Sequence, residues 1–307
     1  MSRPDDSLHL SYLVPEGQYA FFGSLVQPLR DHGIKVTVNG GLGTADVVLA
    51  GLLPTDHRWT PHLERILHPD VVDPHRPRVV LWHWDLYSFT DYSEDRWARF
   101  LKLLPRADRV WSCTYETARE LKAVMNVDSD VVPAWVDPAE FGDPVLGYGL
   151  NDEVLYAASG CGFGKRIDWM EKACKILRLR ATVLRNQTLP RAEYVERIRR
   201  CRVYCMTAFE ESNATIPAME AGVCGRPVVL TDLPSSREVF GNNWGLYFQP
   251  NDFGDLVVKL GRAYHDNEEA SRSARDWIVG RLRDGYGIDR VARLAARRLR
   301  EVAREVG

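Results

Sequence analysis

The segment from Phe209 to Val239 carries residues that could bind a charged ligand. A predicted strand ends near Ala208 and a polar loop follows. Pro217 stands where the first turn of a helix is expected, because proline lacks the N–H group that such a turn leaves unpaired. The backbone amides of Asn213 to Ile216 would then point at an anion, supported by the helix dipole. This pattern predicts a diphosphate site that needs no metal.

Glu220 lies one turn into the same predicted helix. Its carboxylate would repel a phosphate, but it can accept hydrogen bonds from two neighbouring ribose hydroxyls. Amides for phosphate and a carboxylate for sugar together indicate a nucleotide. The spacing alone also allows the alternative that Glu220 merely complements the positive end of its helix.

A glycine-rich segment, SGCGFGKR at 159–166, directly follows the predicted strand Val154–Ala158. Its glycines let the backbone approach a ligand, and Lys165 and Arg166 add positive charge. A P-loop would need Gly at Ser159, and a dinucleotide fingerprint would need Gly where Lys165 stands. The segment therefore disfavours an ATPase or an NAD enzyme. A flexible turn with solvated basic residues is the alternative.

Strands and helices alternate through both halves of the chain. Apolar, β-branched runs that are too short for helices predict buried parallel strands. The expected strands are Leu8–Val14, Ile34–Val38, Ala45–Ala50, Arg78–Trp84, Arg109–Cys113, Asp130–Pro133, Val154–Ala158, Ala181–Leu184, Val203–Thr207 and Val228–Thr231. This alternation predicts an α/β protein with two Rossmann-like, doubly wound domains. Ligands in such folds bind at the carboxyl ends of strands, so an interdomain cleft is the expected site.

Helices are expected between these strands, at Glu94–Leu104, Thr114–Val124, Ile167–Leu177, Arg191–Arg200 and Pro217–Cys224. Thr114 can cap its helix, although Thr117 stands where a full capping box has Glu or Gln. The proline and glycine residues of Pro138–Leu150 predict a linker. We therefore expect domains at 1–145 and 146–285. A C-terminal helix at 286–307 is expected to pack on the first domain with solvated arginines, and a basic surface-binding helix is the alternative.

The composition is that of a soluble globular protein, with 307 residues, 45% hydrophobic, 27% charged and a net charge of −2. It excludes a disordered chain or a fibrous repeat, and the near-zero charge disfavours a dominant nucleic-acid partner. No apolar run approaches the ~20 residues of a membrane span, and the N-terminus lacks the layout of a secretory signal. We therefore expect a cytoplasmic protein without membrane insertion. The six cysteines lack metal-binding spacing and are expected to be reduced thiols.

Three segments of the second half resemble the donor site of GT-B glycosyltransferases of the family 4 type. They are Pro217–Ala221 (PAMEA), Gly225–Val229 (GRPVV) and Arg237–Val239 (REV). The family reads roughly E-G-F-G-L-P-x-x-E-A-x-x-x-G-x-P-V-V, followed by x-E-V. Lys165–Asp168 (KRID) is similar to the family's K-[GR]-x-D, and Ala107–Pro138 is similar to its interdomain stretch.

The resemblance implies a retaining, metal-independent glycosyltransferase of the hexosyl-transferring kind. Its co-substrate would be a nucleoside diphosphate sugar, UDP- or GDP-linked, and it would need no other cofactor. Lys165 and Arg166 would contact the donor phosphates, Glu220 would hold the ribose, and Gly17 would let the first domain approach the donor. The other implied donor-binding residues are Ser212, Asn213, Ala214, Thr215 and Ile216.

The catalytic residues implied by the resemblance require shifts of one position. The family has a glutamate eight residues before the ribose glutamate, where this chain has Ser212, and a one-residue insertion would bring Glu211 to the sugar. The family's arginine after the first strand of the second domain falls at Cys161, so Arg166 or Arg185 would have to supply its charge.

Val79–Asp85 resembles a family strand that ends in His-Asp, with Trp84 at the histidine position and His83 shifted by one. His83 and Asp85 could orient the sugar or assist proton transfer, and a structural role for His83 is the alternative. Trp84 and Tyr87 are expected to line the acceptor site, because aromatic faces suit sugars and flat rings. The acceptor could be a glycan, a small molecule, a protein or a DNA base, and the oligomeric state is open.

The sequence leaves three other functions open. A GT-B-shaped epimerase would isomerise a nucleotide sugar without an acceptor. A degenerate module would bind the nucleotide sugar without turnover, as the changes at Ser212, Cys161 and Trp84 suggest. A DNA-modifying glycosyltransferase would need a basic groove in the first domain.

Overall fold

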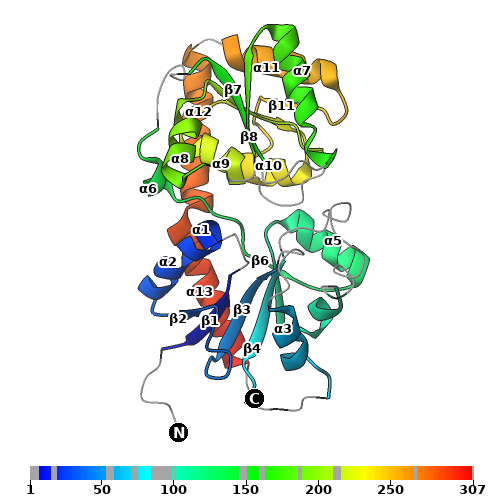
Figure 1. Ribbon diagram of the computed structural model, residues 1–307, viewed down its shortest axis with the longest axis vertical. Coiled ribbons are helices and arrows are strands. Elements are labelled where there is room, and N and C mark those ends of the chain that lie inside the picture. Colours follow the sequence, from blue (N-terminus) through cyan, green and yellow to red (C-terminus); the bar gives the residue numbers. More distant parts are fainter. Residues whose placement is uncertain are drawn as a thin grey trace. The chain divides into compact units, whose positions relative to one another are not determined.

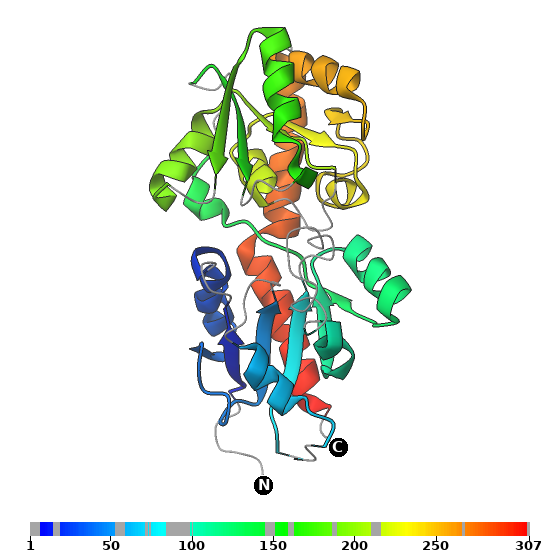
Figure 2. The same cartoon turned by 45° about the vertical axis from the view of Figure 1, so that its right-hand side comes forward.

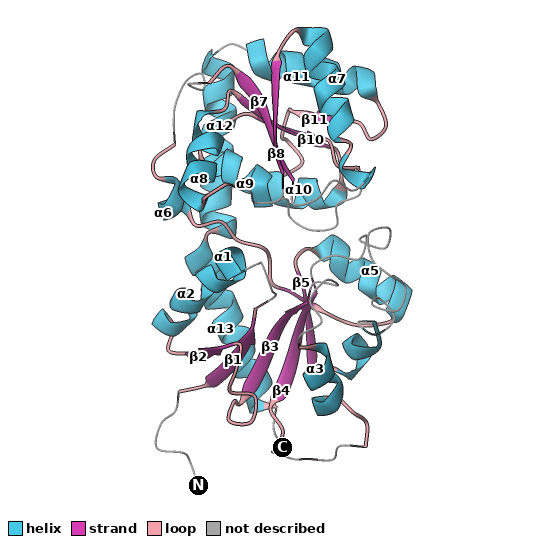
Figure 3. Cartoon of the chain, viewed as in Figure 1, coloured by secondary structure: helices cyan, strands magenta, loops and turns pink. Residues whose placement is uncertain are grey.

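The computed structural model describes residues 7–14, 19–52, 59–70, 73, 75–83, 99, 101–144, 151–158, 163–185, 189–209, 216–265 and 268–305. The chain forms two compact units. Unit 1 comprises Met1–Pro133 together with Ile288–Gly307, and unit 2 comprises Ala134–Gly287. Each unit has a parallel sheet with helices packed on it (Figures 1 and 3).

In the described part of unit 1, six strands form one parallel sheet in the order β2-β1-β3-β4-β5-β6. The strands are β1 (His9–Leu13), β2 (Lys35–Val38), β3 (Val47–Leu52), β4 (Arg78–His83), β5 (Arg109–Ser112) and β6 (Asp130–Val131). The helices are α1 (Tyr19–Phe22), α2 (Val26–Asp31), α3 (Thr60–Ile66), α5 (Tyr115–Met125) and α13 (Ile288–Arg304), with short 3₁₀ turns at Gly23–Leu25 and Leu104–Arg106.

Helices cover both faces of this sheet, which explains why its strands read as continuous apolar runs. On one face, Leu63 of α3 packs in a core with Val48 of β3 and Leu81 of β4. On the other, α13 contacts β3 and α2 (Figures 1 and 2). The apolar side of α13 is buried at Val291, Ala295, Leu299 and Val302, whereas Arg290, Arg293, Arg297 and Arg304 are exposed.

Asp108, just before β5, binds Arg76 and the first two residues of β4. Two nitrogens of Arg76 donate to its carboxylate at 2.7 and 3.0 Å, and Arg78 donates at 3.0 Å. The backbone amide of Val79 adds a bond of 2.7 Å. Burial alone would raise the pKa of Asp108, but these hydrogen bonds outweigh it and lower the pKa below its ordinary value.

This network predicts a pH-dependent contribution to stability. Because folding lowers the pKa of Asp108, its contribution is complete above the pKa of the unfolded chain, about 3.9, and is lost as the pH falls through the lower folded value. We expect Asp108→Asn to reduce the free energy of unfolding by about 2–4 kcal/mol at pH 7, and by clearly less at pH 3.5. Urea titrations at both pH values measure the difference, and an equal loss at both would contradict the prediction.

In the described part of unit 2, five strands form a parallel sheet in the order β11-β10-β9-β7-β8. The strands are β7 (Glu153–Ala158), β8 (Arg180–Arg185), β9 (Val203–Met206), β10 (Val228–Thr231) and β11 (Tyr247–Phe248). The helices are α6 (Pro138–Phe141), α7 (Ile167–Leu177), α8 (Arg191–Arg200), α9 (Ile216–Val223), α10 (Pro234–Phe240), α11 (Phe253–His265) and α12 (Glu268–Tyr286), with a 3₁₀ turn η4 (Phe163–Lys165).

The prediction of two parallel α/β domains is confirmed. The cap of α5 is confirmed too, because the Thr114 side chain accepts from the amide of Thr117. The start of the expected linker is instead helical. Asp137 accepts from the amide of Ala139 and Pro138 occupies the first turn, where its missing N–H costs nothing. The contact-defined unit 2 begins at Ala134 and includes α6, which packs on α8 and α9.

The expected helix at Glu94–Leu104 and the expected free cysteines can be compared with the structure only where residues are described. Most of the helix expected at Glu94–Leu104 lies outside the described residues. The described cysteines are buried free thiols, namely Cys113, Cys174, Cys201, Cys205 and Cys224, and Cys161 lies outside the described part. None of the described helices combines the length and the apolar character that crossing a membrane requires.

Candidate functional site

The direction of strand addition in unit 2 reverses between β7 and β9. The next strand along the chain from β7, β8, lies on one side of it, and β9, β10 and β11 lie on the other. In such sheets ligands bind at the carboxyl ends of the strands beside this reversal. The segments that leave these two ends are the glycine-rich segment at 159–166 and the loop that leads into α9, which are the two segments singled out from the sequence.

Buried hydroxyls hold the end of the glycine-rich segment against these strands. The carbonyl oxygen of Lys165 accepts from the Tyr156 hydroxyl of β7 at 3.1 Å and from Thr207, just after β9, at 3.0 Å. The Thr207 hydroxyl is also 2.7 Å from the carbonyl oxygen of Arg166. These contacts fix the backbone at Lys165 independently of its side chain.

Arg166 joins the two segments through its side chain. Its backbone is left-handed, with φ 44° and ψ 41°, a conformation that is costly for any residue other than glycine. Its guanidinium lies 4.7 Å from the ring centre of Trp169 and 4.6 Å from that of Phe209. The amide of Phe209 donates to the carbonyl oxygen of Gly164 at 3.1 Å. The stacking accounts for the position of Arg166, and its phosphate contact stays a prediction.

Glu220 lies in α9 with only 4% of its side chain exposed. Its Oε1 accepts from Nη2 of Arg191 at 2.7 Å, and its Oε2 accepts from the hydroxyl of Tyr194 at 2.5 Å. Both partners belong to α8. Arg191 also donates from Nε and Nη2 to the two carboxylate oxygens of Glu140 in α6, each at 2.6 Å. Glu220 is therefore a member of a four-residue polar network, hereafter the Glu220 network.

Burial and neighbouring charges both shift the pKa values in this network. Burial raises the pKa of Glu220, while Arg191 and Tyr194 oppose this effect. Burial raises the pKa of Tyr194 and the Glu220 carboxylate adds to that rise, so its hydroxyl keeps the proton that it donates. Burial lowers the pKa of Arg191, but its bonds to Glu140 and Glu220 outweigh this effect. The pKa is therefore raised above its ordinary value, and the guanidinium stays charged. These contacts give Glu220 partners on another helix, beyond the complement to its own helix end that the sequence also allowed.

Tyr204 of β9 contacts Tyr156, whose hydroxyl binds the Lys165 turn. Its ring meets that of Tyr156 edge to face at 6.4 Å, and its hydroxyl donates to the carbonyl oxygen of Ala157 at 3.2 Å. Burial raises the pKa of Tyr204, and the charges of Tyr156 and Glu220 add to this effect. Tyr204 therefore packs against the tyrosine that binds the Lys165 turn, and the Glu220 carboxylate disfavours ionisation of its hydroxyl.

Sequence reasoning missed Arg191, Tyr194 and Thr207. Arg191 and Tyr194 are three residues apart on α8, a spacing that places two side chains on one helix face. That spacing was visible in the sequence, but nothing in it identified Glu220 as their common partner.

In unit 1, His83 ends β4 and is fully buried. Burial lowers the pKa of its imidazole to about 3, so the ring is neutral at neutral pH. The other predicted site residues lie outside the described part of the chain: Gly17, Trp84, Asp85, Tyr87, Glu211, Ser212, Asn213, Ala214 and Thr215. Ile216 begins α9. Within the described ranges, no group of three or more His, Cys, Asp or Glu side chains is arranged to hold a metal ion.

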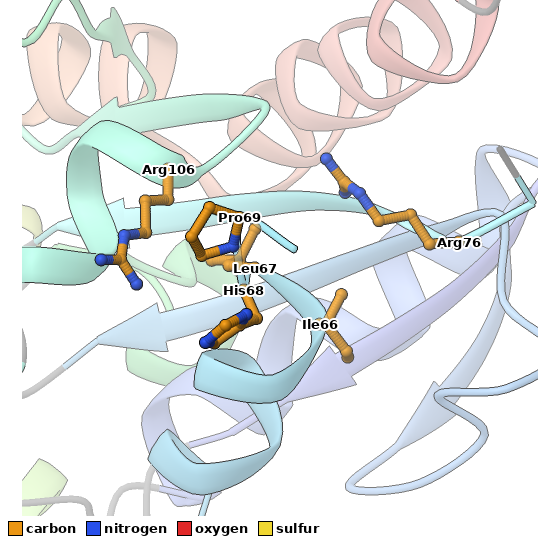
Figure 4. Close-up of a pocket in the computed structure, with 6 residues that line it drawn as sticks. All are labelled: Ile66, Leu67, His68, Pro69, Arg76 and Arg106. Atoms are coloured by element: carbon orange, nitrogen blue, oxygen red, sulfur yellow. The ribbon is translucent and has the colours of Figure 1, made fainter. Parts of the chain in front are cut away.

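A hollow of about 280 Å³ lies in unit 1, lined by Ile66, Leu67, His68, Pro69, Arg76 and Arg106 (Figure 4). Arg76 comes just before β4 and Arg106 just before β5, so this hollow lies at the amino-terminal edge of the sheet. Ligands in parallel α/β sheets bind at the opposite edge. The guanidinium of Arg76 is already bound to Asp108. We therefore do not place the donor site in this hollow.

Comparison with known proteins bears on unit 2 and on the fold. Residues 151–276 match the family model described as Glycosyl transferases group 1. No curated protein matches the chain. The fold is similar to that of sucrose-phosphate synthase from Thermosynechococcus elongatus, with a TM-score of 0.70 and 12% identity over 96% of this chain and 99% of that one.

Two further solved structures share the fold. HepE from Anabaena, in complex with UDP and glucose, gives a TM-score of 0.69 and 14% identity over 96% of this chain and 100% of that one. An alpha-glucosyltransferase, in complex with UDP-glucose and DNA containing an abasic site, gives a TM-score of 0.63 and 12% identity over 96% of this chain and 100% of that one. The two domains thus have the GT-B architecture, and the domain match within unit 2 indicates that this protein is a glycosyltransferase.

Proposed function

We propose that this protein transfers a sugar from a nucleoside diphosphate sugar to an acceptor, with retention of configuration and without a metal ion. The observation that carries the proposal is the carboxyl edge of the unit 2 sheet. The cationic turn at Lys165 and Arg166 follows β7, and α9 with the buried Glu220 follows β9, and these are the two strands beside the reversal. All three lie in the part of the chain that matches the group 1 glycosyl transferases.

Each group has a role in holding the donor. The Glu220 carboxylate would accept hydrogen bonds from the ribose hydroxyls. Lys165 would face the diphosphate, and the backbone amides of Asn213 to Ile216 are predicted to bind its oxygens. The roles of Arg166 and Gly17 at the phosphates stay predictions of the same scheme.

The chemistry breaks the bond between the sugar's anomeric carbon and the diphosphate oxygen, and forms a bond from the acceptor oxygen on the same face. The leaving diphosphate gains negative charge as the bond breaks, and Lys165 stabilises that charge. A diphosphate oxygen takes the proton of the acceptor, so no strongly basic side chain is required. A neutral His83 suits a role in orienting the sugar, as a hydrogen-bonding group.

Two of the structures that share the fold support a uridine donor. HepE is in complex with UDP and glucose, and the alpha-glucosyltransferase is in complex with UDP-glucose. UDP-glucose is therefore the first donor to test, with a GDP-sugar as the second. The test follows release of UDP and the anomeric configuration of the product, with the donor alone and with candidate acceptors. Isomerised donor without transfer would replace this proposal with an epimerase, and binding without either reaction would indicate an inactive module.

Lys165→Ala is expected to lower the turnover of UDP-glucose by about a hundredfold and to weaken UDP binding much less. The reason is that negative charge on the diphosphate grows toward the transition state, so its cationic partner acts chiefly on the rate. The backbone of the turn stays in place, because Tyr156 and Thr207 bind its carbonyl oxygen. Initial rates of UDP release and calorimetry with UDP measure the two effects.

The matched control is Lys175→Ala, an exposed lysine in the last turn of α7. It removes the same charge from unit 2 and should leave both turnover and UDP binding unchanged. If Lys165→Ala behaved like this control, the assignment of Lys165 to the diphosphate would be wrong.

A further inference from the structure

We propose that Arg191 and Tyr194 are positioning residues that hold the Glu220 carboxylate in the orientation that receives the ribose hydroxyls, and that Glu140 tunes this site through Arg191. The inference rests on the proposed function and concerns the same donor site. It is carried by the geometry of the Glu220 network.

The hydrogen bonds of Glu220 leave room for two more donors. A carboxylate has about four acceptor positions, two on each oxygen. Among the described residues, Arg191 fills one position on Oε1 and Tyr194 fills one on Oε2. One position therefore remains on each oxygen, and these two suit the adjacent 2′ and 3′ hydroxyls of a ribose. The carboxylate cannot rotate away without breaking both existing bonds in a buried setting, where an unpaired charge is costly.

Arg191 is itself held from several sides. Both of its bonds to Glu140 measure 2.6 Å, and its guanidinium lies 5.4 Å from the ring centre of Phe141 and 5.1 Å from that of Tyr194. Nη2 carries two hydrogens and points one to Glu140 and the other to Glu220. Glu140 thus fixes the cation that orients Glu220.

Glu140 and Arg191 have opposite effects on the ionisation of Glu220. The negative charge of Glu140 raises the pKa of Glu220, whereas Arg191 lowers it, and both act on top of the rise that burial causes. Only the ionised carboxylate offers all four acceptor positions to donors, so protonation at low pH weakens ribose binding. UDP binding should be lost as the pH falls, and the pH at which half of it is lost is hereafter the acid midpoint. This midpoint should move in opposite directions when each of the two charges is removed.

Other titratable or charged groups belong to the elements that pack on α9. Besides Arg191, Tyr194 and Glu140, they include Arg199 on α8, Tyr204 on β9 and Arg283 on α12, and Cys224 directly follows α9. Burial raises the pKa values of Tyr204 and Cys224, so both are neutral in the working range. Arg199 and Arg283 donate to the carbonyl oxygens of Phe141 and Gly142, respectively. Arg191 and Glu140 are therefore the charges to change.

The experiment compares UDP with 2′-deoxy-UDP, which lacks one of the two ribose hydroxyls. Calorimetry gives the dissociation constant of each nucleotide for the wild type and for Glu220→Gln, Arg191→Gln and Tyr194→Phe. The wild type should prefer UDP by about tenfold or more, the usual effect of one hydrogen bond to a charged group. Glu220→Gln should abolish the preference. Arg191→Gln and Tyr194→Phe should reduce it to less than about threefold.

The second readout is the pH dependence of UDP binding between pH 5 and 8. Arg191→Gln should move the acid midpoint to higher pH, and Glu140→Gln should move it to lower pH. Arg200→Gln is the matched control, since Arg200 ends the same helix and pairs with the exposed Glu196. It should change neither the nucleotide preference nor the midpoint. Thermal melting confirms that each variant is folded, and the conservative variants Tyr194→Phe and Glu140→Gln remain informative if Arg191→Gln unfolds.

The outcomes distinguish a wrong donor site from a wrong positioning role. If Glu220→Gln left the affinities for both nucleotides unchanged, the donor site itself would be wrongly assigned. If Glu220→Gln removed the preference while Arg191→Gln and Tyr194→Phe kept it, with unmoved midpoints, the donor site would stand. The positioning role would then be rejected.

Discussion

Replacing Glu220 by Gln is expected to weaken UDP binding by about ten- to a hundredfold while the protein stays folded. The carboxylate is 4% exposed, and its two bonds from α8 hold it in one orientation. The neutral amide keeps the shape of the side chain but offers one acceptor oxygen instead of two, and hydrogen bonds to a charged group are stronger than those to a neutral one. Calorimetry with UDP measures the loss.

The same substitution should affect KM and kcat differently. The ribose lies away from the reacting bond, so its contacts are much the same in the ground state and in the transition state. Their loss should therefore raise the KM for UDP-glucose more than it lowers kcat. Glu196→Gln is the matched control, because Glu196 is exposed on α8 and pairs only with Arg200 among the described residues. A variant at Glu220 that bound UDP as tightly as this control would refute the ribose assignment.

Trp82→Ala is expected to give the largest loss of stability, about 3–5 kcal/mol in the free energy of unfolding. Trp82 lies in β4 at 0% exposure and meets Trp111 of β5 edge to face at 5.5 Å. Its indole N–H donates to the carbonyl oxygen of Val132 at 3.1 Å. Truncation would therefore leave a cavity, remove an aromatic contact and leave a buried carbonyl without this donor.

Two further variants separate these contributions. Trp82→Phe keeps a ring at the position and loses the hydrogen bond, so we expect a smaller loss of about 1–2 kcal/mol. Val124→Ala, at a 72% exposed position of α5, should change stability by less than about 0.5 kcal/mol. Urea unfolding followed by circular dichroism measures all three. A loss for Trp82→Ala no larger than that for Val124→Ala would contradict the packing described.

The features that sequence predicted correctly depend on neighbours along the chain. A buried parallel strand such as β4 shows as an apolar run, and the Thr114 cap needs only an amide three residues away. The prediction of a linker at Pro138–Leu150 was wrong at its start for a related reason. Breakers are counted without regard to position, whereas a proline preceded by Asp137 starts α6.

The features that sequence could not predict depend on pairs that meet only in the folded protein. Arg191 and Glu220 are separated by 29 residues, and Arg191 and Glu140 by 51. Residue type and spacing suggested Glu220 as a ligand for ribose hydroxyls, which stays a prediction, but gave no partner for it. The left-handed backbone of Arg166 was equally invisible, because a non-glycine residue adopts it only when surrounding contacts, here the rings of Trp169 and Phe209, compensate.

The membership of α13 in unit 1 has a consequence for the order of events during translation. Unit 2 is continuous from Ala134 to Gly287, so every one of its elements has been made before α13 is synthesised. Unit 1 cannot complete its folding at that stage, because the sheet face that α13 covers lacks this helix until residues 288–304 leave the ribosome. The half of the enzyme that is translated first is therefore the half that matures last, and its uncovered apolar face is the natural target for a chaperone during that interval.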